Sequence, residues 1–197
     1  MKKFFIVLAV IILLLVLGAY LLPRHVQVQR SAVIKASPAV LYAQIATPKN
    51  WPNWISWSRM DPNIKMTYFG PDAGTGSGYK WTSDKVGNGT LTITDAKPNE
   101  SVETKMEFGK GGGGTSAFSI KTIDGGTEVI WTMESDMGYN PIARYFGLMM
   151  DKMVGKDFEK GLHLLDSVAV HVPMSTPDTA SASTTSVTND TMSHNKQ

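Results

Sequence analysis

The sequence predicts an α+β fold in which an antiparallel sheet packs against a long C-terminal helix. Six short runs between residues 64 and 134 are separated by glycine-rich turns, which is typical of a meander of strands. The last runs alternate apolar and polar residues, so one sheet face is expected to be apolar and the other solvated. A helical pattern follows from Asn140-Pro141 to about Val168, with its apolar residues mainly on one side. Such a helix is expected to cover the apolar sheet face.

The chain before this meander is expected to contribute one strand and one short helix. Apolar and polar residues alternate from Val26 to Lys35, and Arg30 is the one charged residue on the face that we interpret as inward. Ser37-Pro38 then provides a helix cap followed by proline at the first helical position. The short helix is predicted to end near Thr47-Pro48.

Three tryptophans then indicate a second short helical turn ahead of the sheet. Trp51, Trp54 and Trp57 recur at every third residue, with Pro52 between the first two. This spacing favours a hydrophobic plug that closes one end of the fold. The alternative is an aromatic belt that rests on a membrane interface.

The six strands of the meander can be assigned from the runs themselves. They are Lys65–Phe69, Gly78–Ser83, Gly89–Ala96, Ser101–Phe108, Ser116–Ile123 and Thr127–Glu134. Asp124-Gly125-Gly126 supplies a tight hairpin turn between the last two strands.

An apolar run without a charged residue, Phe4–Leu22, lies near the N-terminus and follows Lys2 and Lys3. As a helix it would be about 28 Å long, close to the hydrocarbon thickness of a bilayer. The sequence favours an uncleaved membrane anchor over a signal peptide, whose apolar part is usually shorter. The two lysines predict a cytoplasmic N-terminus, so the remaining chain is expected in the periplasm or outside the cell.

Three parts of the chain are therefore expected. Residues 1–25 form the membrane anchor, and residues 26–170 form one folded domain. Residues 171–197 are rich in Ser, Thr, Asp, Asn and Pro with almost no large apolar residue, so a disordered tail is expected there.

The amino-acid composition excludes several kinds of site and partner. The chain has no cysteine, which excludes disulfides, thiol nucleophiles and zinc–thiolate sites. The formal net charge is only +2 and the basic residues are scattered, so no nucleic-acid partner is expected. No pair of histidines has metal-ligand spacing within an ordered element. We therefore assign no metal, no cofactor and no catalytic residue from the sequence.

Three motifs accompany this element order. They are Ile34-Lys35-Ala36-Ser37-Pro38, then Trp51-Pro52-Asn53-Trp54-Ile55-Ser56-Trp57 followed by Asp61-Pro62, and Asn140-Pro141-Ile142-Ala143-Arg144-Tyr145-Phe146-Gly147-Leu148. With these motifs, residues 26–168 resemble the SRPBCC superfamily, also called START/Bet v1-like or helix-grip, and more locally its bacterial polyketide cyclase/dehydrase and lipid transport group. The resemblance implies a curved sheet, in the order β-α-α-β6-α, wrapped on the long helix. It also implies a cavity between them for a hydrophobic small molecule.

The inward-facing residues of the sheet and the long helix are the candidates for lining such a cavity. They are Arg30, Trp54, Tyr79, Trp81, Thr104, Met106, Phe118, Trp131, Met133, Phe146, Met149, Met150 and Met153. The 11 methionines of the chain suit an adaptable apolar surface. Arg30, Tyr79 or Thr104 would orient a polar end of the ligand. An ordinary filled core would use the same residues.

Three glycines in the long helix have two interpretations. Gly147, Gly155 and Gly161 each cost about 1 kcal/mol relative to alanine in a helix interior. They either leave room for a ligand or permit close packing of the helix backbone.

The sequence thus favours membrane-anchored binding of a hydrophobic small molecule or a lipid over catalysis. Two alternatives stay open. A cyclase- or dehydratase-like enzyme would need an ionisable group in the pocket, such as a buried aspartate or His163. A structural module of the cell envelope would instead use the exposed sheet face or the tail to contact another protein.

Overall fold

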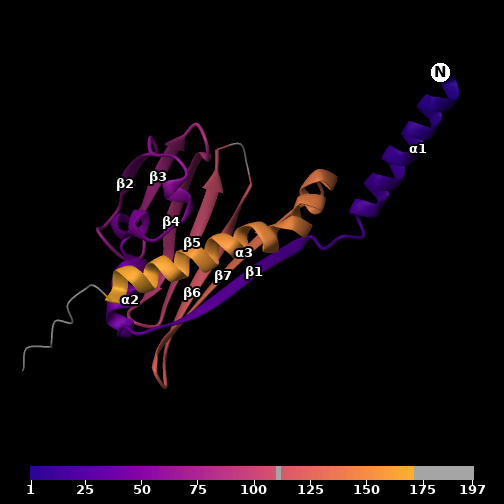
Figure 1. Cartoon of the computed structure of the whole chain (residues 1–197). Helices are drawn as coiled ribbons and strands as arrows, with labels where there is room; N and C mark the ends of the chain where they lie inside the picture. The colour runs from indigo at the N-terminus through magenta and orange to yellow at the C-terminus, as the bar shows by residue number, and fades with distance from the viewer. Residues whose placement is uncertain (110–111, 171–197) are drawn as a thin grey trace, which may run out of the picture.

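The computed structural model describes residues 1–109 and 112–170 (Figure 1). Its elements are α1 (Lys2–Ala19), β1 (His25–Ile34), α2 (Pro38–Ala46), the 3₁₀ helices η1 (Pro48–Asn53) and η2 (Trp57–Arg59), β2 (Lys65–Phe69), β3 (Gly78–Ser83), β4 (Gly87–Lys97), β5 (Ser101–Phe108), β6 (Gly113–Ile123), β7 (Gly126–Asp136) and α3 (Pro141–Val170). The predicted tail, residues 171–197, lies outside the described residues.

The predicted α+β helix-grip architecture is confirmed. The described strands form one antiparallel sheet in the order β1-β7-β6-β5-β4-β3-β2, so consecutive strands of the meander are neighbours and β1 pairs with the last strand. The long helix α3 lies across one face of this sheet (Figure 1). All six predicted meander strands are present, and β2, β3 and β5 have the predicted bounds.

The predicted register is also confirmed. Val102 and Thr104 of β5 are buried, and so are Val129 and Trp131 of β7, whereas Glu103 between the first two is exposed. The hairpin between β6 and β7 turns at Asp124-Gly125, where Gly125 has a φ of +90° that favours glycine. One sheet face is therefore available for packing.

Both predicted helix starts are capped by side chains. The Ser37 hydroxyl accepts a hydrogen bond from the Val40 amide at 3.4 Å, and Pro38 takes the first helical position of α2. At the start of α3, the Asn140 side-chain oxygen accepts from the Ile142 amide at 2.9 Å. These caps fix where the two helices begin.

The three tryptophans form the predicted plug. Trp51 and Trp54 are 1% and 0% exposed, and the Trp51 indole donates to the Ile45 carbonyl oxygen at 2.7 Å. Trp57 of η2 is half-buried against Trp81, with 5.3 Å between their ring centroids. Their burial rules out the aromatic belt that the spacing also allowed.

The three glycines of α3 allow the helix to approach the sheet closely. A Cβ on Gly147 would lie 2.9 Å from Val26, and one on Gly161 would lie 2.9 Å from the Trp131 ring. At Gly155 the added carbon would overlap the Arg30 guanidinium. Side chains of β1 and β7 occupy the space that Cβ atoms would need, so the close-packing alternative applies.

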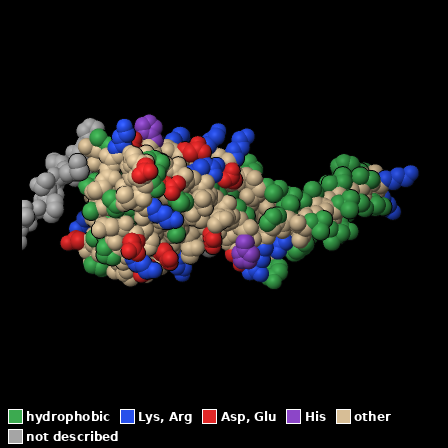
Figure 2. Space-filling model, turned by 90° about the horizontal axis from the view of Figure 1, so that it is seen from below, with side chains coloured by type: hydrophobic (Ala, Val, Ile, Leu, Met, Phe, Trp, Pro, Cys, Tyr) green, Lys and Arg blue, Asp and Glu red, His purple; other side chains and the backbone are tan. Residues whose placement is uncertain are grey.

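The helix α1 projects away from the domain (Figure 1) and is exposed on nearly all sides. It is the single helix among the described residues that is long and apolar enough to cross a membrane, and a signal sequence would have the same character. Figure 2 shows hydrophobic side chains around it and basic side chains at its N-terminal end.

The glycine packing generates a stability prediction. Alanine ordinarily stabilises a helix by about 1 kcal/mol over glycine. Gly161→Ala is expected to do the opposite and lower the free energy of unfolding by about 1 kcal/mol or more, because the Trp131 ring is stacked on Phe158 and cannot easily move. Urea unfolding followed by tryptophan fluorescence measures this, since all five tryptophans lie in the domain.

The matched control for this variant is Lys160→Ala, one residue earlier and exposed. It is expected to change the unfolding free energy by less than about 0.5 kcal/mol. A Gly161→Ala protein more stable than the parent would contradict the close-packing account.

A buried carboxylate next to η2 generates a pH prediction. The Ser83 hydroxyl donates to Asp61 at 2.5 Å and the Asn63 amide donates to it at 2.9 Å, and these two bonds hold the pKa of Asp61 below its ordinary value. The carboxylate therefore stabilises the fold above the ordinary aspartate pKa of about 3.9, and this contribution is lost as pH falls through the lower folded pKa. Ser83→Ala should reduce Tm more at pH 7 than at pH 3.

Thermal unfolding at both pH values measures this difference. In an Asp61→Asn background, Ser83→Ala should give the same Tm change at pH 7 and pH 3. An equal change in the parent background would show that the hydrogen bond does not depend on the charge of Asp61.

Candidate functional site

An apolar cavity of about 530 Å³ lies between the sheet, α3 and the segment that contains η1 and η2. The described residues that line it are Trp51, Ser56, Trp57, Trp81, Val86, Leu91, Thr104, Met106, Phe108, Gly112, Gly113, Gly114, Thr115, Ser116, Trp131, Met133, Ser135, Met137, Phe146, Met150, Val154, Asp157 and Phe158. Its walls are mainly aromatic and methionine side chains, which is typical of a site for an apolar molecule.

The position of α3 explains why space remains there. The helix is packed tightly on β1 and β7 through its glycines, whereas Phe146, Met150 and Val154 lie on the flank that faces the cavity. At the inner end, Trp131 and Phe158 stack with 3.8 Å between ring centroids and an interplanar angle of 8°. These rigid rings form a wall between β7 and α3.

The structure separates the 13 sequence-predicted residues into two groups. Those that line the cavity are Trp81, Thr104, Met106, Trp131, Met133, Phe146 and Met150. Those that do not line it are Arg30, Trp54, Tyr79, Phe118, Met149 and Met153. Members of both groups have the same alternation or helical spacing, so their spacing alone did not distinguish them.

Trp54, Tyr79 and Phe118 are fully buried in the core beside the cavity. All three pack against Trp51, and Trp54 also packs against Phe118, with ring centroids about 5 to 6 Å apart. Met149 is 57% exposed on the outer face of α3, and Met153 is similarly exposed. Trp54, Tyr79 and Phe118 therefore support the cavity wall from behind, whereas Met149 and Met153 lie outside the cavity.

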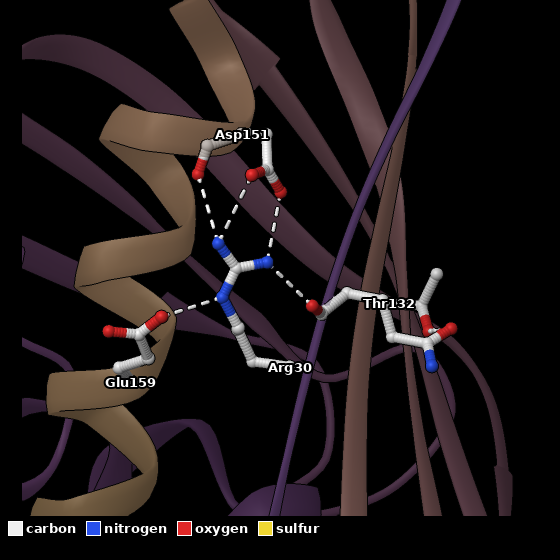
Figure 3. A network of polar contacts seen from close by, with 5 residues as sticks. Arg30, Thr132, Asp151 and Glu159 are labelled. Carbon is white, nitrogen blue, oxygen red and sulfur yellow. Dashed lines mark hydrogen bonds and ion pairs between the residues drawn. The ribbon is translucent and has the colours of Figure 1, made fainter.

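Arg30 forms an ion-pair network with α3, outside the lining of the cavity (Figure 3). Its guanidinium donates to Asp151 at 2.9 Å and to Glu159 at 2.7 Å, both on α3. These hydrogen bonds, first with Asp151 and then with Glu159, raise the pKa of Arg30, and the same bond lowers the pKa of Asp151. Arg30 therefore joins β1 to α3 and does not supply a charge inside the cavity.

Most polar side chains of the cavity wall are hydrogen-bonded within the sheet. The Thr104 hydroxyl donates to the Ser116 carbonyl at 3.4 Å, and the Ser116 hydroxyl donates to the Thr132 carbonyl at 2.8 Å. The Trp131 indole in turn donates to the Ser116 hydroxyl at 2.7 Å. Because these polar groups already bond within the protein, the cavity surface over β5–β7 offers a ligand few hydrogen bonds even where its residues are polar.

Asp157 brings a charge to the cavity wall, and it was not among the residues predicted from the sequence. It is the one charged side chain among the described residues that line the cavity, and Ser56 donates a hydrogen bond to its carboxylate at 3.2 Å. Helical spacing could have identified Asp157 as a lining residue, because it follows Met150 by seven residues on the same face of α3. His163, the other candidate ionisable group, is exposed and outside the lining.

Three buried polar groups nearby have no hydrogen-bond partner within the described part of the chain. They are the Trp81 indole nitrogen, in the cavity wall, and the Trp54 indole nitrogen and the Tyr79 hydroxyl, in the core behind it. Burial raises the pKa of Tyr79 well above its ordinary value, so this phenol is neutral at any physiological pH.

A second hollow of about 660 Å³ lies at the edge of the solvated sheet face. His25, Gln27, Lys105, Glu107 and Glu134 contribute to its lining. It is more open and more polar than the apolar cavity, so it lacks the walls that an apolar ligand needs. Over residues 1–109 and 112–170, no cluster of three His, Cys, Asp or Glu side chains could hold a metal ion.

Solved structures with the same fold support the architecture. An uncharacterised protein from Rhizobium leguminosarum is 14% identical, with a TM-score of 0.56, over 75% of this chain and 96% of its own. Ara h 8.0201 is 13% identical, with a TM-score of 0.54, over 74% and 98%. Aha1 from Colwellia psychrerythraea, solved as a dimer, is 19% identical, with a TM-score of 0.51, over 74% and 97%. At these identities the likeness establishes the fold alone.

No curated protein matches the chain. Residues 25–170, the entire folded domain, match the family described as polyketide cyclase/dehydrase and lipid transport. With the sheet, the covering helix and the cavity between them, this match establishes that the chain belongs to that family, within the SRPBCC superfamily.

Proposed function

We propose that the domain binds a hydrophobic small molecule or a lipid in the apolar cavity, while α1 anchors it in a membrane. The observation that carries this proposal is the cavity itself. Its volume of about 530 Å³ lies within the range of roughly 300–1,000 Å³ that is usual for small-molecule sites. Binding would depend mainly on apolar burial, at about 25 cal/mol per Å² of surface removed from water.

The hydrogen bonding of the wall supports binding over catalysis. Thr104 and Ser116 donate to backbone carbonyls, and Arg30 is engaged by two carboxylates outside the cavity. Neither an array of donors nor a pair of acid and base groups faces the space among the described residues. A passenger with a long apolar body and at most one polar end fits this surface.

Adjacent methionines provide a matched test of the cavity. Met150 lines it, whereas Met149 faces away, so a bulky indole at residue 150 should fill the space and the same change at residue 149 should not. Met150→Trp is expected to weaken binding of N-phenyl-1-naphthylamine by about tenfold or more, a loss of about 1.4 kcal/mol. Fluorescence titration of the domain, residues 25–170, measures this.

Circular dichroism first establishes that both variants are folded. Met149→Trp should bind the probe as the parent does. Equal affinity of the parent and Met150→Trp would place the probe elsewhere and remove the support for the cavity. Native mass spectrometry of the parent purified from a lysate that contains membranes then identifies the chemical class of any passenger.

Asp157 favours one catalytic alternative. A carboxylate in an otherwise apolar pocket can accept a proton from a bound substrate, as a cyclase or dehydratase requires. Asp157→Asn retains the size of the side chain and removes this capacity. If the passenger is chemically altered by the parent and unaltered by Asp157→Asn, the site is catalytic. If both proteins hold the same unaltered passenger, the catalytic alternative is contradicted.

Anchoring by α1 is tested separately. The length of α1 and the exposure of its apolar side chains support a membrane span, and Lys2 and Lys3 favour a cytoplasmic N-terminus. The full chain is expected to resist alkaline carbonate extraction with its N-terminus intact by mass. Val10→Arg, at the middle of α1, should release much of it, because a central charge costs about 2.5–3.5 kcal/mol on insertion scales.

Val10→Leu is the matched control and should remain in the membrane fraction. Protease added to spheroplasts should digest the domain if it lies outside the cytoplasm. A mature protein that begins after residue 19 would identify α1 as a cleaved signal sequence instead.

A further inference from the structure

The first half of α3 has an apolar outer face as well as an apolar inner one. Ile142, Phe146 and Met149 are 79%, 50% and 57% exposed, and Tyr145 and Met153 are also exposed. These five residues follow the spacing of a single helical stripe, on the side opposite the glycines that contact the sheet. We call them the outer stripe. An exposed contiguous apolar surface of this kind marks an interaction site.

The outer stripe gives way to charged residues along the helix. Lys152, seven residues after Tyr145, is the first of them on this face, and Lys156, Lys160 and His163 follow, all exposed. The apolar part is therefore confined to the end of α3 from which α1 extends (Figure 1). If this face of α3 belonged to the core of the fold, its apolar residues would continue along the whole helix.

Direct contacts join this end of α3 to α1. The Tyr145 hydroxyl donates to the Leu15 carbonyl oxygen at 2.9 Å, and the buried Arg144 donates to the carbonyl oxygens of Tyr20 and Leu22, each at 3.2 Å. Leu15 lies four residues before the end of α1, about 6 Å along the helix axis. If α1 spans a bilayer, Tyr145 must lie at the depth of its outermost turn.

Aromatic and basic side chains surround this junction. Arg24 lies over the Tyr139 ring at 5.0 Å and pairs with Asp136 at 2.5 Å, while Arg144 lies over the Tyr20 ring at 5.4 Å. Tyrosine is enriched where a membrane protein crosses the headgroup region, and arginine side chains can extend along apolar surface to keep their charge there. The junction thus has the chemistry of a membrane interface, which the sequence offered only as the alternative interpretation of the tryptophans.

The cavity rim adjoins the same surface. Among the large apolar residues of the lining, Phe108 and Phe146 are the ones that are about half exposed, and Phe146 belongs to the outer stripe as well. A molecule leaving the cavity beside Phe146 would emerge on the outer stripe.

We propose that the outer stripe docks into the membrane leaflet that α1 enters, so that the cavity opens beside Phe146 onto lipid and its ligand passes between bilayer and cavity without crossing water. This inference rests on the proposed anchoring by α1 and deepens the proposed binding function. It identifies the ligand as a molecule that resides in the membrane.

The absence of cysteine in the chain allows a direct test at single positions. Met149→Cys and Lys160→Cys occupy the same face of α3, within and beyond the outer stripe. Each full-length protein is labelled with the NBD fluorophore and reconstituted into vesicles of phosphatidylcholine and phosphatidylglycerol. The label at residue 149 should be quenched severalfold more by doxyl-labelled phospholipid than the label at residue 160, and severalfold less by aqueous iodide.

Iodide quenching is normalised to the fraction of the protein whose domain faces the outside of the vesicle. Equal normalised quenching of the two labels would overturn the docking proposal. This readout requires no bound ligand, so it decides the matter even if the cavity binds nothing. Carbonate extraction of the same vesicles reports separately on α1, which distinguishes a failure of anchoring from a failure of docking.

The path of the ligand has its own readout. N-phenyl-1-naphthylamine supplied in the vesicles accepts energy from the cavity tryptophans when it enters. Met149→Glu in the full chain should slow this uptake severalfold while leaving its final extent unchanged, and Lys160→Glu should leave both the rate and the extent unchanged. Unaltered uptake by Met149→Glu would show that the probe does not enter through the outer stripe.

Discussion

The close approach of α3 to β1 and β7 is the constraint on which the cavity depends. Gly147, Gly155 and Gly161 leave room for Val26, Arg30 and Trp131, so one flank of the helix is held against the sheet. The helix cannot also descend onto β4–β6, because the Trp131–Phe158 stack and the plug of tryptophans occupy the intervening space. What remains between them is the apolar cavity, bounded by side chains that are themselves tightly packed.

The same helix connects the cavity to the candidate membrane anchor. Its glycine-bearing side contacts the sheet, one flank lines the cavity, and its outer stripe faces away from the domain beside α1. Arg144 is central to this arrangement, because its hydrogen bonds to the chain after α1 fix the direction in which α1 leaves the domain. The cavity lining and the outer stripe thus share about two turns of α3, from Phe146 to Met153.

The fold could be predicted almost completely from the sequence. Strand alternation, the Asp124-Gly125 turn and the caps at Ser37 and Asn140 are local signals, and each has a direct geometric meaning for the backbone. The candidate site could be predicted only in part. Period-two alternation identifies the inward face, yet it cannot separate Trp81, which lines the cavity, from Tyr79, which fills the core behind it.

The sequence by itself determined the order of the elements, the apolar sheet face, the candidate anchor and the family, because these depend on residues near one another in the chain. The tertiary structure alone decided the partners of Arg30, the place of Asp157 and the exposure of the outer stripe beside α1. Arg30 meets Asp151 across 121 residues, and Tyr145 meets Leu15 across 130. Such pairings arise from the packing of whole elements, for which no local pattern carries information.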